Sequence, residues 1–80
     1  MDKVTIYSTP YCVFCKLAKE FFKKNNVAYD EKDVASDITA QQEMIAKSGQ
    51  MGVPVIRIGE KIIIGFDTSR IKEALGLSNL

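Results

Sequence analysis

The sequence predicts an α/β fold in which a mixed four-stranded sheet is flanked by three helices, in the order βαβαββα. In the first half, β-forming runs alternate with amphipathic helical patterns, which is typical of a parallel βαβ unit. In the second half, two β-forming runs flank Gly59-Glu60, a two-residue connection of the kind that closes antiparallel hairpins. The 80 residues contain no repeat, linker or low-complexity tract, so we expect one domain over residues 1–80.

The first half is predicted to run from strand to helix to strand. Residues 3–7 alternate as in a strand, and Thr9-Pro10 ends the run. Over residues 12–24, apolar side chains recur at the three and four spacings of one helix face: Val13, Phe14, Leu17, Ala18, Phe21 and Phe22. Asn25-Asn26 ends this helix, and a second strand is expected over 27–33, beginning with its apolar residues.

The second half is predicted to contain a helix, a hairpin and a last helix. The first of these helices covers residues 36–47 and has cap residues at its start. Its expected apolar side consists of Ile38, Gln41, Met44 and Ile45. The hairpin strands are 53–58 and 61–64, and the last helix is expected over 67–75. The apolar side of that helix consists of Ile71, Ala74 and Leu75.

The composition is that of an ordinary globular protein, with 46% apolar and 26% charged residues. The formal net charge of +1 provides no general attraction to nucleic acid or to an anionic membrane, so neither is expected as a partner. No stretch approaches the roughly 20 apolar residues needed to span a bilayer. We therefore expect a cytoplasmic monomer that recognises its partners locally.

The candidate catalytic residues are Cys12 and Cys15, the two cysteines of the chain. A bridge between them closes too short a loop to stabilise the fold much, whereas backbone N–H groups and the macrodipole at a helix start stabilise a thiolate. We expect Cys12 to attack a disulfide and Cys15 to resolve the mixed disulfide. The alternative is that both are structural buried cysteines. No metal is expected, because the chain has no histidine and no second cysteine pair.

Two further features are candidates for binding. Val53-Pro54 opens a predicted strand, where Pro54 could adopt the cis isomer, although an ordinary trans proline at a sheet edge is the more common outcome. Gly65-Phe66-Asp67 offers a close backbone approach, an aromatic face and a carboxylate. The alternative is a turn in which Asp67 only caps the following helix. The lysines of the first helix are interpreted as a solvated face.

The motifs Cys12-Val13-Phe14-Cys15, Gly52-Val53-Pro54 and Gly65-Phe66-Asp67, in this order and spacing, resemble those of the glutaredoxin family of the thioredoxin superfamily. The resemblance covers nearly the whole chain and implies the thioredoxin fold. It implies a cis-proline at Pro54 that faces the cysteines, with the backbone of Val53 pairing with glutathione or a substrate peptide. It also implies that Phe66 and Asp67 hold the γ-glutamyl end of glutathione, Asp67 through a charge-assisted bond to the amino group.

The chain departs from the family pattern at three places related to glutathione. It has Val-Phe rather than Pro-Tyr between the cysteines, Thr9 in place of a lysine, and Ile64-Gly65 in place of two glycines. Thr9 and Gln50 are therefore the two candidates for contacting the glutathione carboxylates. Tyr11, Phe14 and the glycine of Ile64-Gly65 complete the expected binding residues.

The expected function is that of a glutathione-dependent dithiol–disulfide oxidoreductase that reduces protein disulfides or glutathione mixed disulfides. Glutathione is expected as a co-substrate, with no tightly bound cofactor. An alternative is a hydrogen donor to ribonucleotide reductase, recharged by a flavoprotein thioredoxin reductase, because Cys12-Val13 and Gly65-Phe66 also resemble such donors. Those donors generally carry a basic residue where this chain has Asp67, which favours glutathione. An alternative of another class is an iron–sulfur carrier, in which Cys12 of two chains and two glutathiones hold the cluster.

Overall fold

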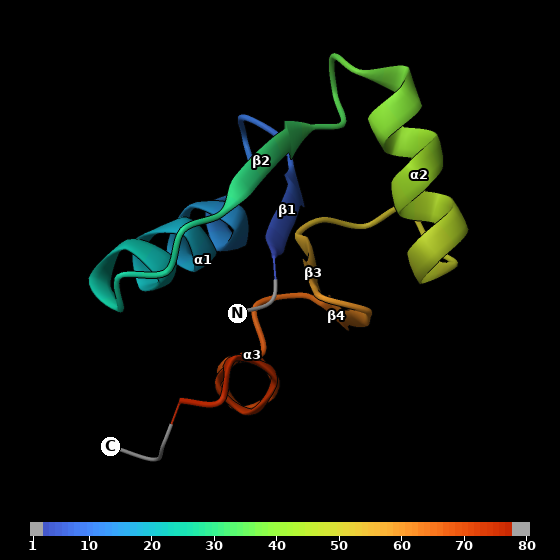
Figure 1. Cartoon of the computed structure of the whole chain (residues 1–80). Helices are drawn as coiled ribbons and strands as arrows, with labels where there is room; N and C mark the ends of the chain where they lie inside the picture. Colours follow the sequence, from blue (N-terminus) through green and yellow to red (C-terminus); the bar gives the residue numbers. More distant parts are fainter. Residues whose placement is uncertain (1–2, 78–80) are drawn as a thin grey trace.

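The computed structural model describes residues 3–77 and shows a sheet with helices on both sides (Figure 1). The elements follow the predicted order, βαβαββα. Their bounds are β1 Val4–Ser8, α1 Val13–Lys24, β2 Asp30–Asp33, α2 Ile38–Ser48, β3 Val55–Ile58, β4 Lys61–Ile64 and α3 Thr68–Leu75. Within the described residues, no helix has both the length and the apolar character needed to cross a membrane.

The four strands form one mixed sheet in the order β2-β1-β3-β4. β1 and β2 are parallel, with Ile6 in register with Glu31, because α1 connects them as the crossover of a βαβ unit. β3 pairs antiparallel with both β1 and β4, and the hairpin turns at Gly59, which adopts a positive φ of 61°. This sheet confirms the predicted α/β architecture and the thioredoxin fold.

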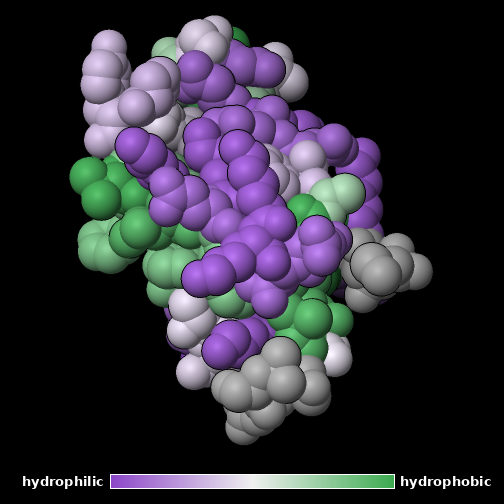
Figure 2. Space-filling model, turned by 90° about the vertical axis from the view of Figure 1, so that its left-hand side faces the viewer, coloured by the Kyte–Doolittle hydropathy of each residue, from purple (hydrophilic) through white to green (hydrophobic). Residues whose placement is uncertain are grey.

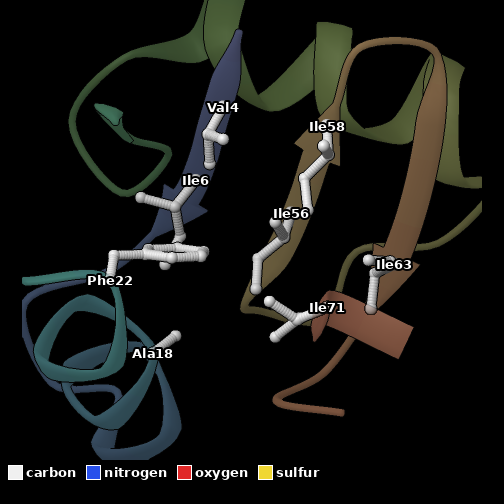
Figure 3. Close-up of a cluster of buried hydrophobic side chains, with 8 residues drawn as sticks. All are labelled: Val4, Ile6, Ala18, Phe22, Ile56, Ile58, Ile63 and Ile71. Carbon is white, nitrogen blue, oxygen red and sulfur yellow. The ribbon is translucent and has the colours of Figure 1, made fainter. Parts of the chain in front are cut away.

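Alternate residues of each strand point to opposite faces of the sheet, and each face has its own core. On one face, Ile6 packs in a cluster with Phe22 of α1 and Ile71 of α3, and all three are fully buried (Figure 3). On the other face, Tyr7 packs with Met44 of α2. Figure 1 shows α1 and α2 on opposite sides of the sheet. The molecule therefore has three layers.

The second strand differs from its predicted position. β2 consists only of the charged residues 30–33, whereas Val27 and Tyr29 pack partly buried against the core without joining the sheet. β2 is an edge strand, where charged side chains keep their contact with solvent. Backbone pairing with β1, rather than apolar alternation, therefore defines this strand.

The apolar side predicted for α2 is partly wrong. Ile38 is 70% exposed, while Ala40 and Met44, one turn apart, are the buried residues of the helix. Beside Met44, Glu43 accepts a hydrogen bond from the hydroxyl of the buried Tyr7. A buried hydroxyl needs a partner, so polar pairing across the sheet helps to orient α2 in a way that apolar spacing does not reveal.

Candidate active site

The two cysteines lie at the N-terminus of α1 and are joined by a disulfide bond. Cys12 is the N-cap residue, with an extended backbone, and Cys15 lies in the first helical turn. Their Cα atoms are 5.2 Å apart, and the Cys15 N–H donates to the Cys12 Sγ over 3.0 Å. The Cys12 sulfur thus occupies the place where a helix presents free N–H donors to an anion.

Exposure distinguishes the two cysteines. Cys15 is 1% exposed and belongs to the buried side of α1, whereas Cys12 is only partly buried. The first turn of α1 contains no acidic residue, so no carboxylate of that turn opposes a thiolate at Cys12. An incoming disulfide or thiol therefore meets Cys12 before Cys15.

The cis-proline loop lies at the same end of the sheet as the cysteine loop. The Val53-Pro54 peptide bond is cis, which agrees with the family resemblance and excludes the trans alternative. Tyr7 of β1 is in register with Val55 of β3. The residues that follow Tyr7 lead to Cys12, and the residue that precedes Val55 is the proline. Antiparallel pairing of β1 with β3 therefore brings these two motifs together.

The third motif, Gly65-Phe66-Asp67, reaches the same end of the sheet through β4. The Gly65 N–H donates to the Pro54 carbonyl over 2.8 Å. Gly65 adopts a φ of 83°, a left-handed conformation that favours glycine. Phe66 is partly buried and packs edge-on against Phe21 of α1, with ring centroids 6.0 Å apart. All three sequence motifs thus lie at the same end of the sheet.

Asp67 is the N-cap residue of α3. Its Oδ1 accepts a hydrogen bond from the Arg70 N–H over 3.2 Å, and its Oδ2 lies 3.5 Å from the Arg70 Nε. The capping interpretation is therefore confirmed. The Asp67 side chain is nevertheless 44% exposed, so capping does not remove its carboxylate from solvent.

Gln50 and Thr9, the two candidates for carboxylate contacts, are held differently. The Gln50 Oε1 accepts from the Gly52 N–H over 2.7 Å, and its Nε2 donates to the Gly52 carbonyl over 3.0 Å. Gln50 thereby shapes the loop before Val53, and its Nε2 also donates to the Ser48 hydroxyl over a longer 3.4 Å, which is the bond that a bound carboxylate would replace most easily. Thr9 is partly buried. Its backbone carbonyl accepts a hydrogen bond from the Cys12 N–H over 3.3 Å, and its side-chain hydroxyl takes no part in that bond.

Apolar side chains on the surface flank the cysteine pair. Tyr11 is 92% exposed, Val13 70% and Phe14 60%, although helical spacing assigned Val13 and Phe14 to the buried side of the helix. The residues that α1 buries form a narrower stripe of Cys15, Ala18 and Phe22. The core covers only this stripe of α1, and the apolar residues beside it remain in contact with solvent.

A polar cluster of Ser8, Lys19 and Glu31, which the sequence did not indicate, connects β1, α1 and β2. The Glu31 Oε2 accepts hydrogen bonds from the Ser8 hydroxyl and from the Lys19 ammonium group, each over 2.8 Å. The bond from Lys19 is the main reason that the pKa of Glu31 is lowered, against the opposing effect of burial. Figure 2 views the side of the molecule that carries α1 and β2, and it shows hydrophilic side chains across the centre with hydrophobic side chains at the edges. Strand alternation was the sequence signal that could have indicated this cluster, because it places Ser8 on the same face of β1 as Ile6.

Comparison with known proteins relates the chain to one family along most of its length. Residues 4–63 match the family model described as Glutaredoxin. The chain is 42% identical over 72 residues to an uncharacterized glutaredoxin-like 8.6 kDa protein in the rubredoxin operon of Clostridium pasteurianum, covering 90% of this chain and 96% of that protein. It is 32% identical over 76 residues to glutaredoxin 3 of Escherichia coli, covering 95% and 92%.

Solved structures also resemble this chain along most of its length. A thioredoxin-like protein superposes with a TM-score of 0.90 at 32% identity, covering 98% of this chain and all of the other. A glutaredoxin from Archaeoglobus fulgidus gives a TM-score of 0.85 at 25% identity, covering 94% and 87%. A buckwheat glutaredoxin in complex with glutathione gives 0.74 at 25% identity, covering 95% and 72%. With its cysteine pair at the start of α1, the chain belongs to the glutaredoxin family and is a thiol–disulfide oxidoreductase.

Proposed function

We propose that the chain reduces protein disulfides and glutathione mixed disulfides, with glutathione as electron donor, Cys12 as nucleophile and Cys15 as resolving thiol. The observation on which this rests is the environment of the pair: both cysteines lie at the start of α1, with Cys12 partly exposed and Cys15 buried. A helix N-terminus favours the thiolate form of the first cysteine. Burial keeps external disulfides away from the second.

Substrate reduction begins when the Cys12 thiolate attacks one sulfur of the substrate disulfide. The substrate bond breaks, a mixed disulfide forms on Cys12, and the departing sulfur leaves as a thiolate that takes a proton. The Cys15 thiol then loses its proton, attacks the Cys12 sulfur and displaces the remaining substrate thiolate. The cysteine pair is oxidised by two electrons and the substrate is reduced by two. Two glutathione thiolates reverse this change in successive attacks and leave as glutathione disulfide.

We assign the glutathione site to the end of the sheet where the three motifs meet. The Val53 backbone would pair with the peptide part of glutathione, and Phe66 and Asp67 would receive its γ-glutamyl end. The exposed Asp67 carboxylate supports this assignment, because it can accept a charge-assisted bond from an amino group. The Thr9 hydroxyl is a candidate for a carboxylate contact. The other lining residues in this assignment are Tyr11, Phe14, Gln50, Pro54 and Gly65.

Two coupled assays that follow NADPH consumption test the electron source. The oxidised protein is supplied with glutathione and glutathione reductase in one assay and with thioredoxin reductase in the other. We expect turnover with glutathione and little with thioredoxin reductase. Turnover only with thioredoxin reductase would overturn glutathione dependence, while leaving the thiol–disulfide exchange itself in place.

A hydrogen donor to ribonucleotide reductase, recharged by thioredoxin reductase, is the second candidate. The observation in its favour is the likeness to a thioredoxin-like protein over almost the full length of both chains. The negative charge of Asp67 favours the first candidate, and the same pair of assays separates the two. Either activity requires a reducing compartment, and we place the protein in the cytoplasm, where thiols are kept reduced.

A further inference from the structure

The cluster of Ser8, Lys19 and Glu31 includes the residue one helical turn after the buried Cys15. Cys15 and Lys19 are one turn apart on α1, a spacing that places their Cβ atoms about 5–6 Å from each other. Ser8 lies on the same face of β1 as Ile6, which packs in one cluster with the following turns of α1. The Lys19 ammonium group bonds Glu31, and the same carboxylate oxygen bonds the Ser8 hydroxyl. The helix spacing and these two bonds therefore place a fixed pair of opposite charges one turn along α1 from the resolving thiol.

Resolution of a mixed disulfide requires the Cys15 thiol to ionise. Cys15 is 1% exposed, and desolvation disfavours its thiolate. The chain has no histidine that could act as a neutral base near physiological pH. Fixed charges near Cys15 can therefore affect how readily its thiol ionises.

The charged groups on the elements around Cys15 differ in the partners that they already bind. From β2, Asp33 is in register with Ser8, but its Oδ1 accepts the Ala35 N–H over 2.9 Å. At the start of α3, Asp67 is paired with Arg70. On α1, Lys16 is exposed, whereas the Lys19 side chain is 26% exposed. Of these two lysines, Lys19 is the one whose side chain is partly enclosed, and Glu31 is its carboxylate partner.

We propose that the Lys19 ammonium group, held in place by Glu31, stabilises the Cys15 thiolate and so accelerates closure of the Cys12–Cys15 disulfide. This rests on the proposed roles of the two cysteines. Lys19 takes no proton: the thiol releases its proton to solvent and the Cys15 sulfur bonds Cys12. The bond between Cys12 and the substrate sulfur then breaks, and the leaving thiolate carries the electron pair. Lys19 is thus a positioning residue for the resolving step, while Glu31 orients the ammonium group and partly offsets its charge.

The ionisation of Glu31 supports this arrangement. Its pKa is lowered by the bond from Lys19, so its carboxylate is charged at neutral pH. Loss of Lys19 alone would leave that anion without its cation next to Cys15. Loss of Glu31 alone would leave the cation without its anion. The two substitutions should therefore move the pKa of Cys15 in opposite directions.

Single-turnover kinetics with the neutral disulfide dithiodipyridine separate the two chemical steps. An equimolar amount releases one thiopyridone when Cys12 attacks and a second when Cys15 closes the disulfide. For Lys19→Gln we expect closure about three- to tenfold slower at neutral pH, with its pH profile shifted upward and the first step unchanged. For Glu31→Gln we expect faster closure, because the amide oxygen can still accept the bond that orients Lys19 while the negative charge that offsets the ammonium group is gone. Lys23→Gln, which neutralises an exposed lysine one turn further along α1, is the matched control.

Opposite effects of Lys19→Gln and Glu31→Gln, with partial recovery in the double variant, would support the proposal. Equal slowing by both would mean that the pair only holds α1 against β2, and would overturn it. Unchanged closure in Lys19→Gln would overturn it as well. Absence of the first release in the unmodified protein is a different failure, because it would remove the nucleophilic role of Cys12 on which the proposal rests.

Discussion

At the level of single residues, the cysteine pair shows how two identical side chains acquire different chemistry. Cys12 and Cys15 are separated by one helical turn, yet Cys15 is enclosed by the core and Cys12 is partly open to solvent. The helix N-terminus acts mainly on the N-cap sulfur. The order of attack and resolution proposed for this protein therefore follows from position rather than from residue type.

Replacing Cys15 with serine should trap substrate on Cys12. The hydroxyl of Cys15→Ser cannot displace a thiol from a mixed disulfide, so incubation with glutathione disulfide should leave one glutathione on Cys12. Intact-mass measurement detects this adduct, and reduction of protein disulfides through the dithiol route should be lost. The matched variant Cys12→Ser should form no adduct, and an adduct on its Cys15 would contradict the exposure argument.

Acid should destabilise the protein through two glutamates whose pKa values are lowered in the folded state. Bonds from Tyr7 and then Lys32 lower the pKa of Glu43, and the bond from Lys19 lowers that of Glu31. The stabilisation is present above their unfolded value of 4.5 and is lost as pH falls through the lower folded values. Urea unfolding at neutral and acid pH measures this decline.

The variant Glu43→Gln provides the control for the acid effect. It can still accept the Tyr7 hydrogen bond but has no proton to gain, so its unfolding free energy should fall less steeply with acid than that of the unmodified protein. An unchanged slope would show that Glu43 does not contribute to the loss of stability in acid.

The same hydrogen bond affects Tyr7 at alkaline pH. Burial, followed by the bond to Glu43, raises the pKa of Tyr7 to about 12.

At the level of elements, Asp67 combines two roles that different substitutions can separate. Asp67→Ala removes the cap of α3 and should lower the unfolding free energy by about 0.5–2 kcal/mol, as urea titration would measure. Asp67→Asn keeps a capping oxygen and should leave stability almost unchanged. Because it removes the charge proposed to bind the glutathione amino group, we expect KM for glutathione to rise roughly tenfold. An unchanged KM in Asp67→Asn would contradict the binding role.

At the level of the whole molecule, stability depends on the core that α1 and α3 form on one face of the sheet. Phe22 of α1 belongs to this cluster and is fully buried (Figure 3). Phe22→Ala should cost about 3–5 kcal/mol. A chain of 80 residues has a total unfolding free energy of about 4–12 kcal/mol. We therefore expect circular dichroism to show a largely unfolded or marginally stable variant.

Phe14 offers the matched control on the same helix. It is 60% exposed, so Phe14→Ala should change the unfolding free energy by about 0.5 kcal/mol or less. Equal losses for Phe14→Ala and Phe22→Ala would contradict the observed split of α1 into a buried stripe and an exposed apolar flank.

Local sequence information was sufficient for the order of the elements, the hairpin and the chemistry of the cysteine pair. Strand alternation, helical periodicity and cap residues such as Asp67 act over a few positions, so they can be recognised without the fold. The Cys-x-x-Cys spacing places two thiols on one helical turn wherever that helix packs. The joint spacing of three motifs extended this local information to the family.

The features that local patterns did not predict depend on contacts between segments that are distant in the sequence. Charged residues 30–33 became a strand because β1 offered them backbone partners, and α2 turned Glu43 rather than Ile38 toward the sheet because the buried Tyr7 hydroxyl required an acceptor. The burial of Cys15, and the pairing of Lys19 with Glu31 beside it, depend on how α1 packs on β1 and β2. Local periodicity contains no information on such pairings, because each joins residues that only the folded chain brings together.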